Sequence, residues 1–378
     1  MRLFSFISPN LPLITELMAG PVVAAAILVL GVAGAGASAS GINIVNSCLG
    51  EYPIEPSDSG YKTYTYATGL GAVGNAPDVG ATGRSGSATT LDLFMPENPP
   101  KPPPVIVSLH GGGFSEFADR GYEALEVGSA TTGQDLYLSQ PSSLTGNGYA
   151  VAEVWYPLAT SEGVNAFPTE LQAAVCAIRY LKANAGALRI DGSRMMIMGF
   201  SAGAAIGSTV AAIGTQKIGP IPDPTVGTLP KGQHYDSPNC AYNRTTDTQV
   251  LGTLNYYGFY DLVGACTSMG STLASYFGAD ISCPPAGANA ALFKSASSYW
   301  QATSSTPGMF ITRGSADNAS LQFVSDAMYK KSLSLGIPSA YVTVPDAQHG
   351  FFILPNTQAE YQQELCTALT YMKSILKP

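Results

Sequence analysis

The sequence has few charged residues and no basic cluster. Charged residues make up 12% of the 378 positions, about half of the ~25% that is usual for soluble proteins. Eighteen basic and 26 acidic residues give a net charge of −8, and no run of five or more basic residues occurs. Binding to a phosphate backbone depends on such basic patches. We therefore expect no nucleic-acid partner.

Metal and cofactor motifs are also missing. The chain contains three histidines, and none of its six cysteines has C-x-x-C spacing, so no zinc-ligand cluster is indicated. Three consecutive glycines at residues 111–113 do not form the G-x-G-x-x-G pattern that opens a helix in dinucleotide-binding units. We expect no metal and no cofactor.

A run of about 20 apolar residues, as needed to span a membrane, is absent. Residues 22–32 form an apolar run that is short enough for a signal peptide, and Ala37-Ser38-Ala39 is an A-x-A cleavage signal. The pattern predicts a signal peptide at residues 1–39, a secreted or periplasmic protein and no stable membrane insertion. An uncleaved N-terminal anchor is the alternative, because the segment before the apolar run is long and has a single cation, Arg2.

All six cysteines lie beyond the predicted cleavage site, and an even number in an exported chain favours disulfides. Six cysteines allow fifteen pairings. Cys266 and Cys283 are the nearest pair, although Cys240 is close enough in sequence to compete for either partner. Nothing in the sequence indicates an oligomeric state.

Strand-like and helix-like segments alternate from residue 91 onward, which predicts an α/β fold with a mostly parallel sheet covered by helices on both faces. No internal repeat or linker interrupts residues 40–378, so we expect one domain. The expected strands are residues 91–95, 105–109, 149–156, 195–198, 251–256, 309–312 and 340–344, and the expected helices are residues 169–184, 202–213, 321–335 and 359–376.

Residues 215–249 interrupt this alternation. They are rich in Pro, Gly and Asn and lack a clear period. A long irregular stretch within a domain is usually a functional loop or disordered. The segment is either a cap over the functional site or a surface excursion held by a disulfide from Cys240.

Gly199-Phe200-Ser201-Ala202-Gly203 fits the pattern G-x-S-x-G, with an expected strand before it and an expected helix of small residues after it. A sharp strand-to-helix turn projects the serine hydroxyl from the carboxyl edge of the sheet, and flanking glycines avoid clashes. Ser201 is therefore the candidate nucleophile.

His110-Gly111-Gly112-Gly113-Phe114 directly follows an expected strand. Acyl transfer produces an oxyanion that needs donors fixed in advance, and backbone N–H groups of a glycine-rich turn can supply them. We expect the N–H groups of Gly111, Gly112 and Ala202 to form an oxyanion hole. His110 is expected to brace the loop.

The general base follows by elimination among the three histidines. Where a nucleophilic serine occupies such a turn, the order along the chain is serine, acid, histidine. His110 precedes Ser201, and His234 lies in the irregular segment with Asp223 as the one acid between it and the serine. His349 follows the last expected strand and is the candidate base.

Asp317 is the candidate acid. It follows the strand expected at residues 309–312 and precedes His349 by enough chain for one helix and one strand. Its role would be to orient the imidazole and to stabilise the imidazolium. Asp326 falls within the next expected helix, Asp346 is crowded against the histidine, and Asp261 comes one strand too early.

With these motifs assembled, the chain resembles the α/β-hydrolase esterases, in particular the hormone-sensitive-lipase-like and bacterial feruloyl/acetyl-xylan-esterase-like groups. The resemblance extends from about residue 91 to residue 376 and is carried by the motifs LDLFMP, HGGGF, YPLA, AIRYL, RIDGSR, GFSAG, RGSAD and HGF. It implies the α/β-hydrolase fold and the same roles for the residues named above. The chain departs from these groups at Pro157, Phe200 and Ala204, which leaves the subgroup and the substrate open.

The expected function is a serine esterase that hydrolyses carboxylic esters through an acyl-enzyme. The substrate would be a small-molecule or polymer-linked ester. A serine peptidase on the same fold and a catalytically silent hydrolase-like binding protein are the alternatives. Six loop aromatics could line an acyl or aryl pocket or pack in the core: Phe114, Phe117, Trp155, Tyr156, Phe351 and Phe352.

Overall fold

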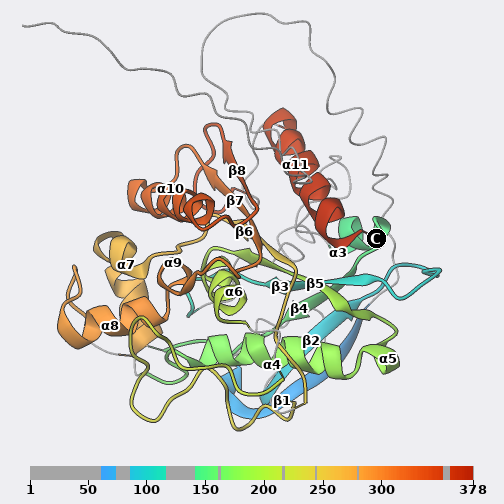
Figure 1. The fold of residues 1–378 in the computed structure, drawn as a ribbon, viewed down its shortest axis with the longest axis horizontal. Helices are drawn as coiled ribbons and strands as arrows, with labels where there is room; N and C mark the ends of the chain where they lie inside the picture. Colours follow the sequence, from blue (N-terminus) through green and yellow to red (C-terminus); the bar gives the residue numbers. More distant parts are fainter. Residues whose placement is uncertain are drawn as a thin grey trace, which may run out of the picture. The chain divides into compact units, whose positions relative to one another are not determined.

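An eight-stranded sheet organises the computed structural model (Figure 1). The structure describes residues 61–73, 86–115, 141–160, 163–214, 218–242, 245–278, 281–351 and 358–377, all in one compact unit of the chain. The predicted signal peptide lies outside the described residues, and so does Cys48.

The strand order is β1-β2-β4-β3-β5-β6-β7-β8. β2 pairs antiparallel with β1 and with β4, and every pairing from β4 onward is parallel. The predicted fold class, a mostly parallel sheet of the α/β type, is confirmed. The strands are β1 (Tyr61–Val73), β2 (Gly86–Phe94), β3 (Pro104–Leu109), β4 (Ala150–Val154), β5 (Asp191–Phe200), β6 (Gly252–Tyr256), β7 (Gly308–Gly314) and β8 (Ser339–Val344).

Helices cover both faces of the sheet (Figure 1). The described helices are α3 (Pro141–Gly146), α4 (Thr169–Ala183), α5 (Ala185–Leu188), α6 (Ala202–Ile213), α7 (Leu262–Phe277), α8 (Gly287–Ser295), α9 (Ser298–Gln301), α10 (Ala319–Ser334) and α11 (Gln358–Leu376). None of these helices is both long enough and apolar enough to cross a bilayer.

Burial on both faces explains the sequence of the central strands. In β3, Val105 and Val107 pack in the core beneath α4 and α6, whereas Ile106 packs in the opposite core with Leu144 of α3 and Leu369 of α11. All six residues of β3 are buried. Successive side chains of a strand point to opposite faces, so a strand between two helical layers reads as a continuous apolar run.

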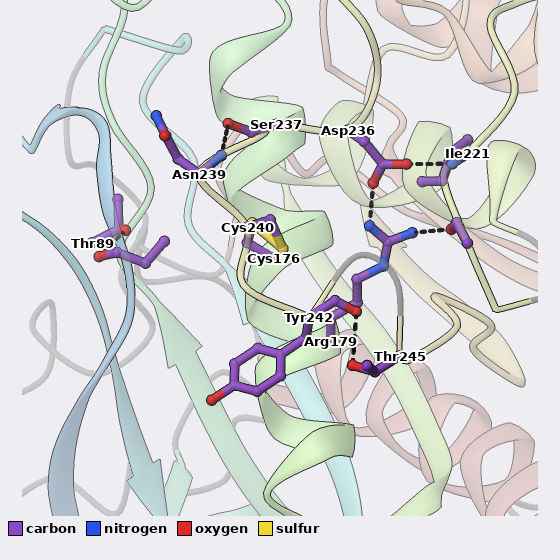
Figure 2. The surroundings of a disulfide bond; sticks show 12 residues. Thr89, Cys176, Arg179, Ile221, Asp236, Ser237, Asn239, Cys240, Tyr242 and Thr245 are labelled. Carbon is purple, nitrogen blue, oxygen red and sulfur yellow. Dashed lines mark hydrogen bonds and ion pairs between the residues drawn. A yellow bond between two sulfur atoms is a disulfide. The ribbon is translucent and has the colours of Figure 1, made fainter.

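The described part of the irregular segment, residues 218–242 and 245–249, packs against α4. Cys240 forms a disulfide with Cys176 of α4, and Asp236 forms a buried ion pair with Arg179 of the same helix (Figure 2). Its described residues contain no helix or strand. These contacts agree with a surface excursion held by a disulfide from Cys240, and the cap over the site stays a prediction.

A second disulfide joins Cys266 of α7 to Cys283. The predicted pairing of these two neighbours is therefore confirmed, and Cys240, the competing candidate, pairs with Cys176. Cys366 of α11 is disulfide-bonded too. α7 is thus tied covalently to the segment that leads into α8.

Candidate active site

Ser201 lies at the sharp turn between β5 and α6. Its φ of 51° and ψ of −112° lie in a region that costs a non-glycine residue about 1–3 kcal/mol. Its backbone N–H donates to the carbonyl oxygen of Tyr256 at 2.9 Å, and the residue is buried. The strained turn is therefore held in place by the neighbouring strand β6.

Gly203 allows α6 to begin directly against the end of β3. A Cβ atom on Gly203 would lie 2.1 Å from the carbonyl oxygen of Leu109 and 2.4 Å from that of His110. Only hydrogen fits in this space. The close approach brings the start of α6, where the N–H groups lack partners within the helix, against the glycine-rich turn. Ala202, a predicted oxyanion donor, is the first residue of α6.

The glycine-rich turn follows β3 and is fixed at its first residue. The Tyr156 hydroxyl donates to the carbonyl oxygen of His110 at 2.7 Å, and the imidazole of His110 stacks on the ring of Tyr156 with a centroid distance of 4.0 Å. His110 therefore braces the loop. Gly111 is buried, and Gly112, with a φ of 103°, turns the chain.

Phe114 ends the turn in a tight aromatic cluster. Its ring stacks on Tyr276 of α7 with a centroid distance of 3.8 Å and meets Phe259 edge-on at 5.6 Å. Burial raises the pKa of Tyr276 well above its usual value, so this ring stays neutral. α7 thereby supports the turn that carries Gly111 and Gly112.

The structure brings Ser201, His349 and Asp317 together. Ser201 Oγ lies 2.9 Å from His349 Nε2, and His349 Nδ1 lies 3.1 Å from Asp317 Oδ2. The carboxylate of Asp317 is 1% exposed and the imidazole of His349 is 36% exposed. Oδ1 of Asp317 accepts the N–H of Asn318 at 2.6 Å. An Nδ1–H donated to the carboxylate leaves Nε2 free to accept the serine proton.

Two hydrogen bonds join the turns that carry Asp317 and His349. The N–H of Ala316 donates to the carbonyl oxygen of Ala347 at 2.9 Å, and the N–H of Asp346 donates to Ser315 Oγ at 2.7 Å. A Cβ atom on Gly314 would lie 2.0 Å from the Ala347 oxygen. The spacing of Asp317 and His349 is thus set by contacts between the two turns, a role of Gly314 and Ser315 that sequence reasoning missed.

The histidine and aspartates that ranked lower occupy other places. His234 lies 3.1 Å from Asp223 within the irregular segment, with both side chains more than half exposed. Asp261 caps α7 and accepts the indole N–H of Trp300 at 2.9 Å. Asp326 pairs with Arg313, and Asp346 lies in the loop before His349 with a φ of 54°.

The described loop aromatics pack inside the molecule. Phe114, Tyr156 and Phe351 are fully buried and Trp155 is 6% exposed, so they belong to the core. Phe117 and Phe352 lie outside the described residues. Tyr257, which sequence reasoning did not single out, packs against the imidazole of His349 with a centroid distance of 5.0 Å.

The sequence indicated no metal site, and the side chains that could form one are those of His, Cys, Asp and Glu. Within the described ranges, no three of these side chains are grouped so as to hold a metal ion. Ser201, His349 and Asp317 form a hydrogen-bonded series, and such arrangements are recognised by geometry rather than by chain order.

Solved structures with the same fold include several esterases. A truncated carbohydrate esterase from gut microbiota superposes with a TM-score of 0.59 at 17% identity, over 84% of this chain and 99% of that chain. A thermophilic esterase from Thermogutta terrifontis has a TM-score of 0.56 at 18% identity, over 86% of this chain and 96% of that chain. An acetyl ester-xyloside bifunctional hydrolase from Caldicellulosiruptor lactoaceticus has a TM-score of 0.56 at 18% identity, over 76% of this chain and 89% of that chain.

No curated protein matches the sequence. Residues 91–331, well over half of the chain, match the BD-FAE family. This stretch includes the turn at Ser201 and the turn at Asp317 and stops before His349. The fold, the order of the motifs and this match agree: the chain belongs to the BD-FAE family of esterase-like α/β-hydrolases.

Proposed function

We propose that the protein is a serine esterase that hydrolyses carboxylic esters through an acyl-enzyme intermediate. One observation carries the proposal: Ser201 Oγ lies 2.9 Å from His349 Nε2, while Nδ1 of the same ring lies 3.1 Å from the buried carboxylate of Asp317. Membership of an esterase-like family supports the reaction class.

In the first half-reaction, Ser201 Oγ attacks the carbonyl carbon of the ester and its proton passes to His349 Nε2. Asp317 holds the ring in the required tautomer and stabilises the imidazolium that forms. The tetrahedral intermediate then collapses, the C–O bond to the alcohol breaks, and the leaving oxygen takes the proton from Nε2. The product is an ester of Ser201 and the free alcohol.

The N–H groups of Gly111, Gly112 and Ala202 would hold the oxyanion of the tetrahedral intermediate. The positive end of the α6 dipole adds to this stabilisation. Donors carried by the main chain need no reorganisation as charge develops, and removing one oxyanion donor typically costs about 10²–10³ in kcat. The contact of Gly203 with β3 keeps the two halves of the hole together.

In the second half-reaction, water replaces the alcohol. His349 Nε2 takes a proton from the water, the hydroxyl attacks the acyl carbon, and collapse of the second tetrahedral intermediate returns the proton to Ser201 Oγ. A carboxylic acid leaves. No step requires a metal or a cofactor.

Short-chain esters linked to carbohydrate are the substrates to test first. The structural neighbours include a carbohydrate esterase and an acetyl ester-xyloside hydrolase, which supports a small or polymer-linked ester. A peptide substrate in the same assay series tests the alternative of a serine peptidase.

We also propose export to an oxidising compartment. Disulfides join Cys176 to Cys240 and Cys266 to Cys283, and disulfides persist in secreted and periplasmic proteins. The sequence signal for cleavage after Ala39 supports the same interpretation.

Hydrolysis of a nitrophenyl acetate by wild type and Ser201→Ala tests the function. The substitution should lower kcat by about 10⁴–10⁶ and leave the fold intact. Ser208→Ala is the matched control, because Ser208 lies in α6, the helix that directly follows Ser201, and its hydroxyl bonds to Ser298 at 3.0 Å. This variant should retain wild-type turnover. Near-wild-type turnover of Ser201→Ala would remove the proposed nucleophile.

A further inference from the structure

Tyr257 lies between the nucleophile turn and the histidine loop. Its ring meets the His349 imidazole at a centroid distance of 5.0 Å and an interplanar angle of 66°. Its ring also lies near those of Phe351 and of Phe200, the residue before Ser201, at centroid distances of 5.1 Å and 6.3 Å. Tyr257 is 1% exposed, so these contacts enclose its ring.

The backbone of Tyr257 is fixed as firmly as its ring. The residue directly follows β6 and has a φ of 42°, a left-handed conformation that costs energy for a bulky residue. Its N–H donates to the carbonyl oxygen of Thr312 in β7 at 2.7 Å. The neighbouring strand therefore holds the chain in this conformation, which directs the ring of Tyr257 toward His349.

The imidazole of His349 needs such a support. Among the contacts described, its hydrogen bond to Asp317 fixes one edge of the ring, and more than a third of its side chain is exposed. The hydrogen bond between Nε2 and Ser201 Oγ breaks and re-forms as the proton moves, so during turnover the bond at Nδ1 alone leaves the ring free to tilt. The aromatic contact with Tyr257 limits this tilt and keeps Nε2 directed toward Ser201.

We propose that Tyr257 is a positioning residue for the general base, acting on catalysis through the orientation of the His349 ring. The inference rests on the proposed function. During turnover, Nε2 takes a proton from Ser201, gives it to the leaving alcohol, and repeats the exchange with water. A displacement of about 1 Å at such a centre lowers the rate about 10²-fold.

The test compares Tyr257→Leu, Tyr257→Phe and Tyr260→Leu. Leucine removes the aromatic contact, whereas phenylalanine keeps the ring. Tyr260 is the matched control, because it is also a fully buried tyrosine after β6 and packs in a separate cluster with Met309 and Ile311. For each folded variant, kcat and KM are measured with a nitrophenyl acetate, together with the rate of Ser201 labelling by a fluorophosphonate.

Tyr257→Leu should lower kcat and the labelling rate about 10- to 100-fold with little change in KM. Tyr257→Phe should restore both rates to near wild type, and Tyr260→Leu should leave both unchanged per folded molecule. Equal losses in Tyr257→Leu and Tyr260→Leu would show a general packing effect and overturn the proposal. So would a loss in Tyr257→Phe that matches the leucine variant, because the hydroxyl would then carry the effect.

Labelling of the wild-type protein tests the proposed esterase function separately from the positioning role of Tyr257. If the fluorophosphonate does not modify Ser201 in the wild-type protein, the proposed function fails. If it modifies wild type and Tyr257→Leu at the same rate, the function stands and the positioning role of Tyr257 is refuted.

Discussion

Glu364 gives a stability prediction with a definite sign. The side chain lies on α11, is fully buried and is close to Tyr256 of β6. Burial disfavours the charged carboxylate and raises its pKa to about 8. Glu364→Gln keeps nearly the same shape and removes the ionisation.

The folded state binds this proton more tightly than the unfolded chain, whose carboxyl has a pKa near ~4.3. The neutral acid therefore contributes stability that is complete below the unfolded pKa and is lost as pH rises through the folded pKa of about 8. Each pH unit within this window costs up to ~1.4 kcal/mol. Between pH 5 and pH 8 the loss from Glu364 is about 3 kcal/mol, a large part of a typical stability of ~5–15 kcal/mol.

Denaturant unfolding at a series of pH values from 5 to 8 measures the effect. The stability of Glu364→Gln relative to wild type should rise by about 3 kcal/mol across this range. Glu170, a second buried carboxyl whose pKa is raised by burial, is present in both proteins, so the difference isolates Glu364. Glu97→Gln, at an exposed position, should keep the wild-type pH dependence. Parallel curves for Glu364→Gln and wild type would refute the reasoning.

Three further predictions concern packing, charge and processing. In thermal melts, Gly203→Ala should destabilise the fold by about 3 kcal/mol, because its Cβ would overlap a β3 carbonyl oxygen. Gly186→Ala is the control and should be tolerated, because nothing lies within 4 Å of its Cβ position. Asp236→Ala should cost about 3–5 kcal/mol in denaturant unfolding, because the guanidinium of Arg179 is left buried without its ion-pair partner. The intact mass of the secreted protein should lack residues 1–39, and the mature chain should resist thiol alkylation until it is reduced.

The elements with strong apolar patterns were predictable, and those held by tertiary contacts were not. The expected helix at residues 202–213 coincides with α6, and the strand expected at residues 105–109 is β3 without its first residue. β5 begins at Asp191, ahead of the strand expected at residues 195–198. Its first four residues are not buried, so no apolar pattern marks them in the sequence. α7 was missed: Gly264 and Gly270 weaken its helical pattern, and its stability comes from the cap by Asp261 and from packing.

The proposed triad was predictable because rare residues carry it. With three histidines in the chain, the order of motifs selected His349, and the strand pattern selected Asp317. Tyr257 had no such signal, since the chain contains twenty tyrosines and its contact with His349 joins residues far apart in sequence. Gly314 was equally hidden, because its role depends on the backbone of a loop that follows β8.

Close backbone contacts explain how the proposed site keeps its geometry. Gly203 joins the nucleophile turn to the end of β3, and Gly314 joins the acid turn to the histidine loop. The N–H of Ser201 is tied to β6. Distances fixed by the main chain do not depend on side-chain rotamers, which is the condition for donors and bases to be preorganised. Substitutions that separate these backbones should therefore lower kcat for every ester alike, whereas substitutions of side chains around the turns should change KM from one ester to another.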